Sequence, residues 1–415
     1  MNVKEAGHDR RIAEQTTHSL EAYKLFVTGQ SSYYNGNPIQ AIREASQAVA
    51  LDSTFLEAIR ALAIWYDTIG DSANALKNAR SAKALSRDRN ETEYLQSLIV
   101  ECQVLRNWDR NVAYLTRYLK LRPNDVNKRL QLGYVFSRGK KAFDKAISQF
   151  NEVIRLDPEN RSDRLGPAYN HLGQAYLYSG KFDSAMIAFK KYQANAPNNP
   201  DPLHSLAHAL SFHGDYEAAA RQFRQIIQEY PYYYKAYDDL GGAYLAMGKW
   251  RDARQVLEAY RRVVPKGMRP RGYLQLGRVY FIQGNAILAE KEIQKALALQ
   301  AENLQAHWLR GLNALLVSAE LDTAQQELQR MERILALPRV HDEMAYYHHL
   351  RGQILVAEGK LEEGLAALHK AVDASQREFI HFKKELAEGY LIAGQPEETI
   401  REALELLSFN ANAAE

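Results

Sequence analysis

The sequence predicts an all-α protein built from antiparallel helix hairpins. Large and small residues recur along the chain with a period of 34 residues, and a turn residue recurs midway through most periods. No segment alternates apolar and polar residues with period two between turn residues, so the sequence gives no sign of strands. One hairpin cannot bury both of its faces alone, and we therefore expect the hairpins to stack into an array.

Residues 166–199 are the clearest copy of the pattern. Leu172 and Tyr176 are four residues apart, so they share one face of a first helix and present bulk to a partner helix. Gly173 has no Cβ and lets the partner backbone come close. Gly180 suits the left-handed backbone conformation that ends a helix. These residues predict a first helix followed by a tight turn.

A second helix follows that turn. Ala185 and Phe189 supply its small and large contacts, and Pro197 prevents the helix from continuing. The same frame predicts about eleven copies, of which those beginning at 126 and 304 need one extra residue near the inter-helix turn. The copies are residues 22–55, 56–89, 92–125, 126–160, 166–199, 200–233, 234–267, 270–303, 304–337, 345–378 and 380 onward.

The domain organisation follows from this frame. Residues 1–21 are polar and without a pattern, and we interpret them as an N-terminal lead or linker. Residues 22–413 form the predicted array, with a linker-like discontinuity near 338–344. We also expect an exposed apolar C-terminal face, covered by a further segment or by self-association, because the last second helix carries several leucines and a finished array needs a polar cap.

The pattern resembles the tetratricopeptide repeat family over nearly the whole chain. That resemblance implies a right-handed α-solenoid whose inner groove holds extended or helical peptides. The segments THSLEAYKLFVTGQ and IREASQAVALDSTFLEAIRALA resemble the repeat region that follows the catalytic domain of many bacterial serine/threonine kinases. Related regions follow winged-helix domains in bacterial regulators. The resemblance therefore implies a place in bacterial signalling.

Composition excludes several classes of protein. Lys plus Arg number 53 against 50 Asp plus Glu, so the overall charge of +3 gives no reason to expect direct binding to nucleic acid. Cys102 is the single cysteine, which fits a reducing compartment. The N-terminus lacks the apolar core of a secretory signal, and no apolar run is long enough to span a bilayer. We expect a cytoplasmic protein that does not bind membranes.

Motifs for catalysis are absent, so we expect no enzymatic activity and no cofactor. The sequence contains no G-x-S-x-G, H-E-x-x-H or G-x-G-x-x-G pattern. His204 and His208 lie one turn apart with Asp201 nearby, a spacing that would suit a divalent metal. We favour the alternative, that they are polar residues lining the array, and assign no metal site.

We count the first residue of each copy as position 1. Helical spacing then places positions 2, 5, 9 and 12 of each first helix on the face next to the core. By the resemblance, that face lines the binding groove. The predicted groove residues are Asn170, Gln174, His204, His208, Lys235, Asp238, Arg271, Leu274, Arg278, Phe281, Trp308 and Leu312. The stretch from Lys249 to Arg278 carries nine basic residues against two acidic ones, and we favour a solvated outer face over a site for an acidic partner. Within the predicted groove, Phe281 and Trp308 lie beside Arg271 and Arg278, so we expect a protein or peptide partner with acidic and apolar residues.

These observations predict a non-enzymatic scaffold or sensor arm that binds a protein or peptide. Two alternatives remain open from the sequence. One is a regulatory domain that senses a small molecule, and the other is the accessory region of a transferase.

Overall fold

The structure is a computed structural model that describes residues 17–34, 37–161, 163–265, 268–336, 344–375 and 379–411. For residues 379–381 and 405–411 only the backbone is described. The predicted discontinuity at 338–344 lies outside these residues except for Met344, and it stays a prediction. The helix α2 begins at Leu20, so the last two residues of the predicted lead belong to the first helix.

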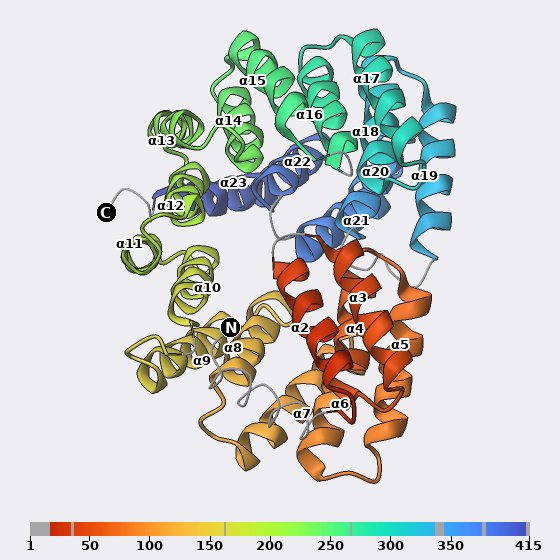
Figure 1. Ribbon diagram of the computed structural model, residues 1–415. Coiled ribbons are helices and arrows are strands. Elements are labelled where there is room, and N and C mark those ends of the chain that lie inside the picture. Colours follow the sequence, from red (N-terminus) through yellow and green to blue (C-terminus); the bar gives the residue numbers. More distant parts are fainter. Residues whose placement is uncertain are drawn as a thin grey trace. The chain divides into compact units, whose positions relative to one another are not determined.

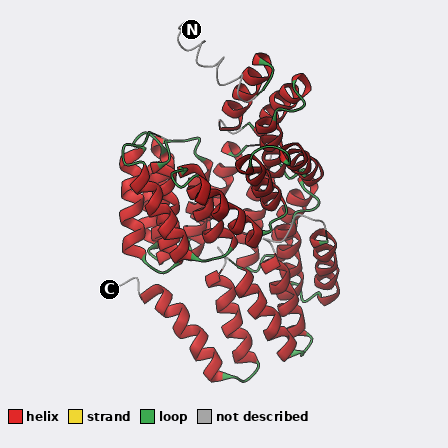
Figure 2. Cartoon of the chain, turned by 90° about the horizontal axis from the view of Figure 1, so that it is seen from below, coloured by secondary structure: helices red, strands yellow, loops and turns green. Residues whose placement is uncertain are grey.

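Every long regular element in the described ranges is a helix, and none is a strand (Figure 2). The twenty-two α-helices of this part of the chain follow one another as hairpins, and each packs mainly on its neighbours in sequence (Figure 1). The predicted all-α solenoid of paired helices is therefore confirmed. Within the described residues, no helix is both long enough and apolar enough to cross a bilayer.

The chain divides into two compact units, residues 1–175 and 176–415. In the first unit, the helices are α2 (Leu20–Tyr34), α3 (Pro38–Leu51), α4 (Leu56–Thr68), α5 (Ser72–Ser86), α6 (Glu91–Val104), α7 (Trp108–Leu121), α8 (Val126–Tyr134) with the π-helical turn η1 (Val135–Gly139), α9 (Phe143–Leu156) and most of α10 (Leu165–Tyr178).

The second unit begins within the last turn of α10. Its helices are α11 (Phe182–Asn195), α12 (Pro200–His213), α13 (Tyr216–Glu229), α14 (Tyr234–Ala246), α15 (Trp250–Val263), α16 (Arg269–Ile282), α17 (Ala286–Leu299), α18 (Leu304–Leu312) with the π-helical turn η3 (Asn313–Val317), α19 (Leu321–Leu335), α20 (Met344–Ala357), α21 (Leu361–Ala374), α22 (Phe379–Ile392) and α23 (Pro396–Ala411).

In every hairpin from α4–α5 to α22–α23, the turn between the two helices contains one residue with positive φ. Gly180, for which the sequence predicts a left-handed turn, has φ +77°. Position 15 of the frame carries such a residue in eight described copies, and it is glycine in all but one of them, where Arg106 has φ 53°. Glycine adopts this conformation without the steric cost of a Cβ. The recurring glycine thus sets the length of the first helix in the seven copies that carry it.

The extra residue predicted for two copies lies in the first helix and its turn. In these copies the residue with positive φ comes at position 16, as Lys141 (φ 49°) and Ala319 (φ 56°). The first helix ends in a π-helical turn in both cases, η1 and η3. A π turn holds one more residue than an α turn. The helix therefore absorbs the added residue before the chain reverses.

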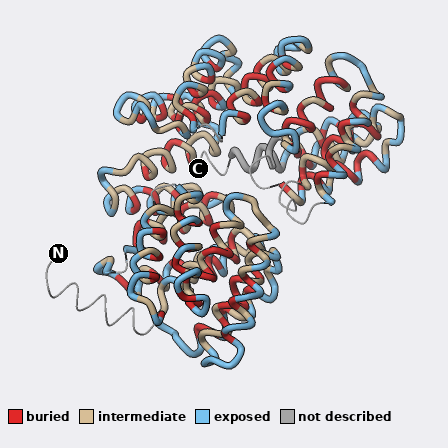
Figure 3. The backbone as a smooth tube through the Cα atoms, turned by 45° about the vertical axis from the view of Figure 1, so that its right-hand side comes forward, coloured by how far each residue is buried: buried red, intermediate tan, exposed pale blue. Residues whose placement is uncertain are grey.

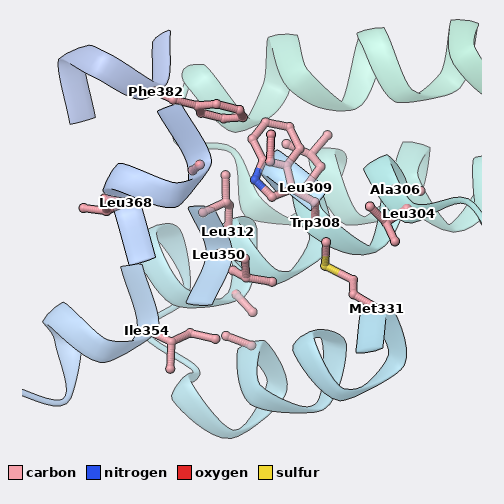
Figure 4. Close-up of a cluster of buried hydrophobic side chains, with 14 of the residues drawn as sticks. Leu304, Ala306, Trp308, Leu309, Leu312, Met331, Leu350, Ile354, Leu368 and Phe382 are labelled. Carbon is pink, nitrogen blue, oxygen red and sulfur yellow. The ribbon is translucent and has the colours of Figure 1, made fainter. Parts of the chain in front are cut away.

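Buried residues gather on the helix sides that face neighbouring helices, and the inter-helix turns are more exposed (Figure 3). The small residues of the repeat, such as Ala185 and Ala219, are fully buried. A large cluster joins α16–α22 of the second unit, and Trp308 lies within it (Figure 4). Close packing of small residues against large ones accounts for the tight hairpins.

Candidate functional site

The twelve predicted groove residues lie on five first helices. Asn170 and Gln174 are on α10 in the first unit, where the Gln174 side chain donates to Asn170 Oδ1 at 3.3 Å. The other ten are in the second unit, on α12, α14, α16 and α18. Positions 2, 5 and 9 lie on one side of each of the helices α12, α14, α16, α18 and α20. We call this side the first-helix face.

Between α12 and α14 the face is held by polar side chains from both helices. Asp201 accepts hydrogen bonds from the Tyr233 hydroxyl and from Lys235, whose Nζ is 3.0 Å away. Burial alone would raise the pKa of Asp201, but these two donors hold it below its usual value. The Nε2 atom of His204 lies 2.8 Å from Asp239 Oδ2. Asp201 and His204 therefore have protein partners on α14 or at its start.

The spacing of His204 and His208 in the sequence would suit a metal ion. Among the described residues, no three His, Cys, Asp or Glu side chains lie close enough together to hold a metal ion. The rings of His204 and His208 are 6.4 Å apart between centroids.

Between α14 and α16 the polar contacts continue through Asp238. Arg271 places Nε 2.7 Å and Nη2 2.6 Å from Asp238 Oδ2, and Gln275 donates to Oδ1 at 2.8 Å. Asp238 is only 8% exposed, so its charge is removed from water and compensated by Arg271. The sequence interpretation placed Asp238 in the open groove, and that part was wrong. Asp238 instead fixes the position of Arg271.

Next to this pair is a pocket of about 90 Å³ on the first-helix face. Its lining comes from α16, α18 and α20 and combines two guanidinium groups, two amides, two aromatic rings and one aliphatic side chain. The residues are Arg271, Leu274, Gln275, Arg278, Gln305, Trp308 and Tyr346. Four of the predicted groove residues thus meet at one cavity, which we call the α16–α18 pocket.

Three lining residues of this pocket were missing from the sequence prediction. Gln305 and Tyr346 both occupy position 2 of their copies, the position that also selects Arg271. Applying that rule to the last copies would have found them. Gln275 is at position 6, and its role depends on the contact with Asp238, which the pattern does not contain.

Trp308 requires a correction, because it is not an exposed anchor of the groove. It is only 4% exposed, and its Nε1–H donates to His349 Nδ1 at 3.0 Å. The indole packs near the ring of Phe382, with ring centroids 6.3 Å apart (Figure 4). Trp308 still lines the α16–α18 pocket, but very little of it is accessible to solvent. The first helix of the next repeat, α20, carries His349 and accounts for the burial.

The same correction applies to the apolar part of the predicted groove. Leu274 is 5% exposed and Leu312 is 2% exposed, and both belong to the large core cluster. Phe281 is half-buried against that cluster. Position 5 of successive copies, occupied by Asp238, Leu274 and Trp308, is therefore covered by adjacent first helices. The accessible part of the face is carried by position 2 and, apart from the buried Leu312, by position 9.

Comparisons with known proteins agree on the repeat. Two family models described as tetratricopeptide repeat match the chain, one at residues 213–271 and the other at 166–199 and 270–303. Superkiller protein 3 of Schizosaccharomyces pombe is 25% identical over 182 residues, which cover 42% of this chain and 13% of that protein. BBSome complex member BBS4 of Bos taurus is 22% identical over 212 residues, covering 51% of this chain and 39% of that protein. The match thus spans well under half of each relative.

Two solved structures are similar in fold. A tetratricopeptide repeat protein from Parabacteroides merdae has a TM-score of 0.47 and 18% identity, with 64% of this chain and 98% of that chain covered. Yeast Tom70 has a TM-score of 0.48 and 15% identity, with 95% and 94% covered.

Proposed function

We propose that this chain, which is built from tetratricopeptide repeats, is a non-enzymatic scaffold or sensor arm that binds a protein partner on the first-helix face of its second unit. Proteins with these repeats typically mediate protein–protein interaction. The partner presents a peptide with acidic and apolar residues, and one acidic side chain enters the α16–α18 pocket. Stacked helices offer a long, stable face with side chains at regular spacing, which suits recognition of an extended segment.

The α16–α18 pocket is the observation that carries the proposal. Arg278 provides positive charge, the guanidinium of the ion-paired Arg271 adds N–H donors, and Gln275 and Gln305 provide amide groups at the same cavity. Arginine binds carboxylates with paired donors in a fixed geometry. At about 90 Å³ the pocket has room for one small side chain and little more. The contact with Asp238 holds Arg271 in place before a ligand arrives, and this reduces the entropy lost on binding.

The proposal also includes where the protein acts and in which kind of pathway. We place the protein in the cytoplasm, in bacterial signalling. The likeness of its opening repeats to kinase-linked repeat regions supports the pathway, and the single, buried Cys102 fits a reducing compartment. No direct contact with nucleic acid or membrane is part of the proposed function.

We further propose that the C-terminal helices contribute to self-association. Helices α22 and α23 carry four large apolar side chains that are 58–64% exposed. These are Leu391, Ile392, Ile400 and Leu404. Sedimentation velocity across a hundredfold range of concentration would test this, and Leu391→Lys with Ile400→Lys should shift the protein toward monomer. A parent protein that stays monomeric throughout would contradict it.

Binding can be tested with a peptide array. Acidic peptides with apolar flanks are screened first, and the affinity of the best one is measured by fluorescence polarisation. Arg278→Glu and Gln305→Glu each place a carboxylate at the α16–α18 pocket, and each should weaken binding at least tenfold. Arg251→Glu changes the charge of the exposed side of α15 by the same amount as Arg278→Glu and should change the affinity less than twofold.

Thermal melts of all variants separate a binding defect from unfolding. If Arg278→Glu and Arg251→Glu weaken binding equally, the effect is one of overall charge and the proposed site is wrong. A preference for basic or purely apolar peptides would also reject it.

A further inference from the structure

A second pocket, of about 330 Å³, opens where the second helix α15 meets the first helix α16 of the next repeat. Its lining contains none of the twelve residues predicted for the groove. The residues are Glu258, Arg261, Arg262, Arg269 and Tyr273. Three guanidinium groups against one carboxylate leave the lining with two net positive charges. We call this the α15–α16 pocket.

Arg261 is held in place by its surroundings. Its guanidinium carbon lies 4.5 Å from the centroid of the Tyr273 ring, within the range of a cation–π contact. Gly272 makes room for this, because a Cβ at that position would lie 2.9 Å from Arg261 Cγ. The nearest acidic group, Glu292, is 3.9 Å from Arg261 but already bonded to Lys295 Nζ at 2.5 Å. Arg261 is thus oriented at the pocket without being fully neutralised.

Arg262 and Arg269 complete the positive side of the pocket. Both are exposed, and no described carboxylate lies within 4 Å of either guanidinium. Glu258 also has no ion-pair partner in the described ranges. Arginines normally gather where they bind an anion or compensate an acidic group, because like charges repel. At this pocket the described acidic groups are Glu258 and the already paired Glu292, which do not compensate three guanidinium groups.

We infer that the α15–α16 pocket binds a phosphorylated serine or threonine side chain of a protein partner. A phosphate monoester carries a charge of about −1.5 to −2 near neutral pH, which matches the two net positive charges of the lining. A carboxylate carries about half that charge and would leave the pocket positive. Guanidinium groups bind phosphate oxygens in pairs, and three of them surround this cavity.

This inference goes beyond the proposed function, because it concerns another pocket and a different ligand chemistry. The α16–α18 pocket, at about 90 Å³, takes an unmodified acidic side chain, whereas the α15–α16 pocket has more than three times that volume. Both pockets use residues of α16, but helical spacing puts Arg269 and Tyr273 on the other side of that helix from Arg271 and Arg278. Phosphorylation would control how tightly the partner is held at the α15–α16 pocket.

The test uses the full chain and three pools of fluorescent nonapeptides. The pools share random flanks and differ only at the central residue, which is phosphoserine, glutamate or serine. Fluorescence polarisation should give at least tenfold tighter binding to the phosphoserine pool than to the glutamate pool. Inorganic phosphate should compete with it. Equal affinity for the phosphoserine and glutamate pools would overturn the inference.

Two double variants locate the effect. Arg262→Glu with Arg269→Glu reverses two charges of the pocket and should weaken phosphoserine binding at least tenfold. Arg251→Glu with Arg254→Glu makes the same change of net charge on α15 outside the pocket and should weaken it less than twofold. The milder Arg262→Gln with Arg269→Gln should also weaken it, which covers the case in which the first variant does not fold. Equal losses in the pocket and control variants would overturn the inference.

Two further binding measurements distinguish the α15–α16 pocket from the α16–α18 pocket and from a nucleic-acid site. Arg278→Glu in the α16–α18 pocket should leave binding to phosphoserine nearly unchanged, so either site can fail without the other. A single-stranded RNA oligonucleotide also presents phosphates to a basic pocket. Tighter binding of that oligonucleotide than of the phosphoserine pool would show that the phosphopeptide assignment is wrong.

Discussion

The indole of Trp308 connects two repeats through its ring and its N–H group. His349, fully buried on α20, accepts that N–H at Nδ1, so its own proton lies on Nε2 and is donated to Glu385. Trp308→Ala should lower the free energy of unfolding by about 3–5 kcal/mol, because it leaves a cavity in the core. Trp308→Phe should cost less, about 1–3 kcal/mol, mainly by leaving His349 without its donor. Urea unfolding monitored by circular dichroism measures both changes.

If Trp308→Ala left the unfolding midpoint unchanged but abolished peptide binding, Trp308 would be an exposed anchor after all. Arg251→Ala serves as the control for an exposed residue on a nearby helix, and its expected effect on stability is below about 0.5 kcal/mol.

His171 gives the first unit a dependence on pH. Burial lowers the pKa of His171 from 6.5 to about 4, with a contribution from the nearby charge of Arg138. The unfolded chain then takes up a proton below pH 6.5 while the folded chain does not, so stability falls as pH drops from 6.5 toward 4. The loss should reach at most about 3 kcal/mol. His171→Gln should remove this part of the slope, as measured by unfolding at several pH values. Identical slopes in parent and variant would contradict the assignment.

At the scale of the helix, neighbouring glycines in α14 have opposite roles. A Cβ at Gly241 would lie 2.6 Å from Leu257 Cδ2, and Leu257 is itself fully enclosed on α15. Gly241→Ala should therefore destabilise the protein by about 1–3 kcal/mol through overpacking. At Gly242 a Cβ meets no atom within 4 Å, so Gly242→Ala should stabilise it by about 0.5–1 kcal/mol. Thermal melts of the two variants should shift in opposite directions.

Hairpins and turns could be predicted from the sequence because their signals are local. The spacing from Leu172 to Tyr176 and the glycine at position 15 fix a helix and its end within a few residues. The environment of Trp308 could not be predicted, since it depends on His349, forty-one residues later, and on how closely α20 approaches α18. The contact between Asp238 and Arg271 spans thirty-three residues in the same way. A repeat pattern specifies which residues face a neighbour, but not how much of each side chain the neighbour covers.

Buried charge was a further feature that the pattern did not predict. Glu327 on α19 is 1% exposed and contacts His307, Arg310 and Arg330. Its position in the frame gave no hint of this, because the frame records size rather than charge. Such a cluster is compensated only when all its members are in place, so it forms after the helices that carry it have come together.

At the scale of the whole chain, packing mainly between neighbours in sequence predicts that damage stays local. Gly352→Ala would place a Cβ 2.7 Å from Leu368 Cγ and strain the hairpin of α20 and α21. Hydrogen exchange measured by mass spectrometry should show reduced protection in α20, α21 and the helices next to them. Protection in α4–α7 should stay unchanged, because an array unfolds in parts. An equal loss of protection along the entire chain would mean that the array unfolds as one cooperative unit.

The two π-helical turns show where a repeat can change its length. An insertion within a regular helix rotates every later side chain of that helix by about 100° and moves core residues toward solvent. In η1 and η3 the additional residue is taken up just before the chain reverses, so the second helices α9 and α19 still bury Phe150 and Met331. These turns therefore let a repeat change its length while its core stays in register. Deleting one residue from η1 would return that copy to 34 residues, and the buried side of α9 should keep its neighbours.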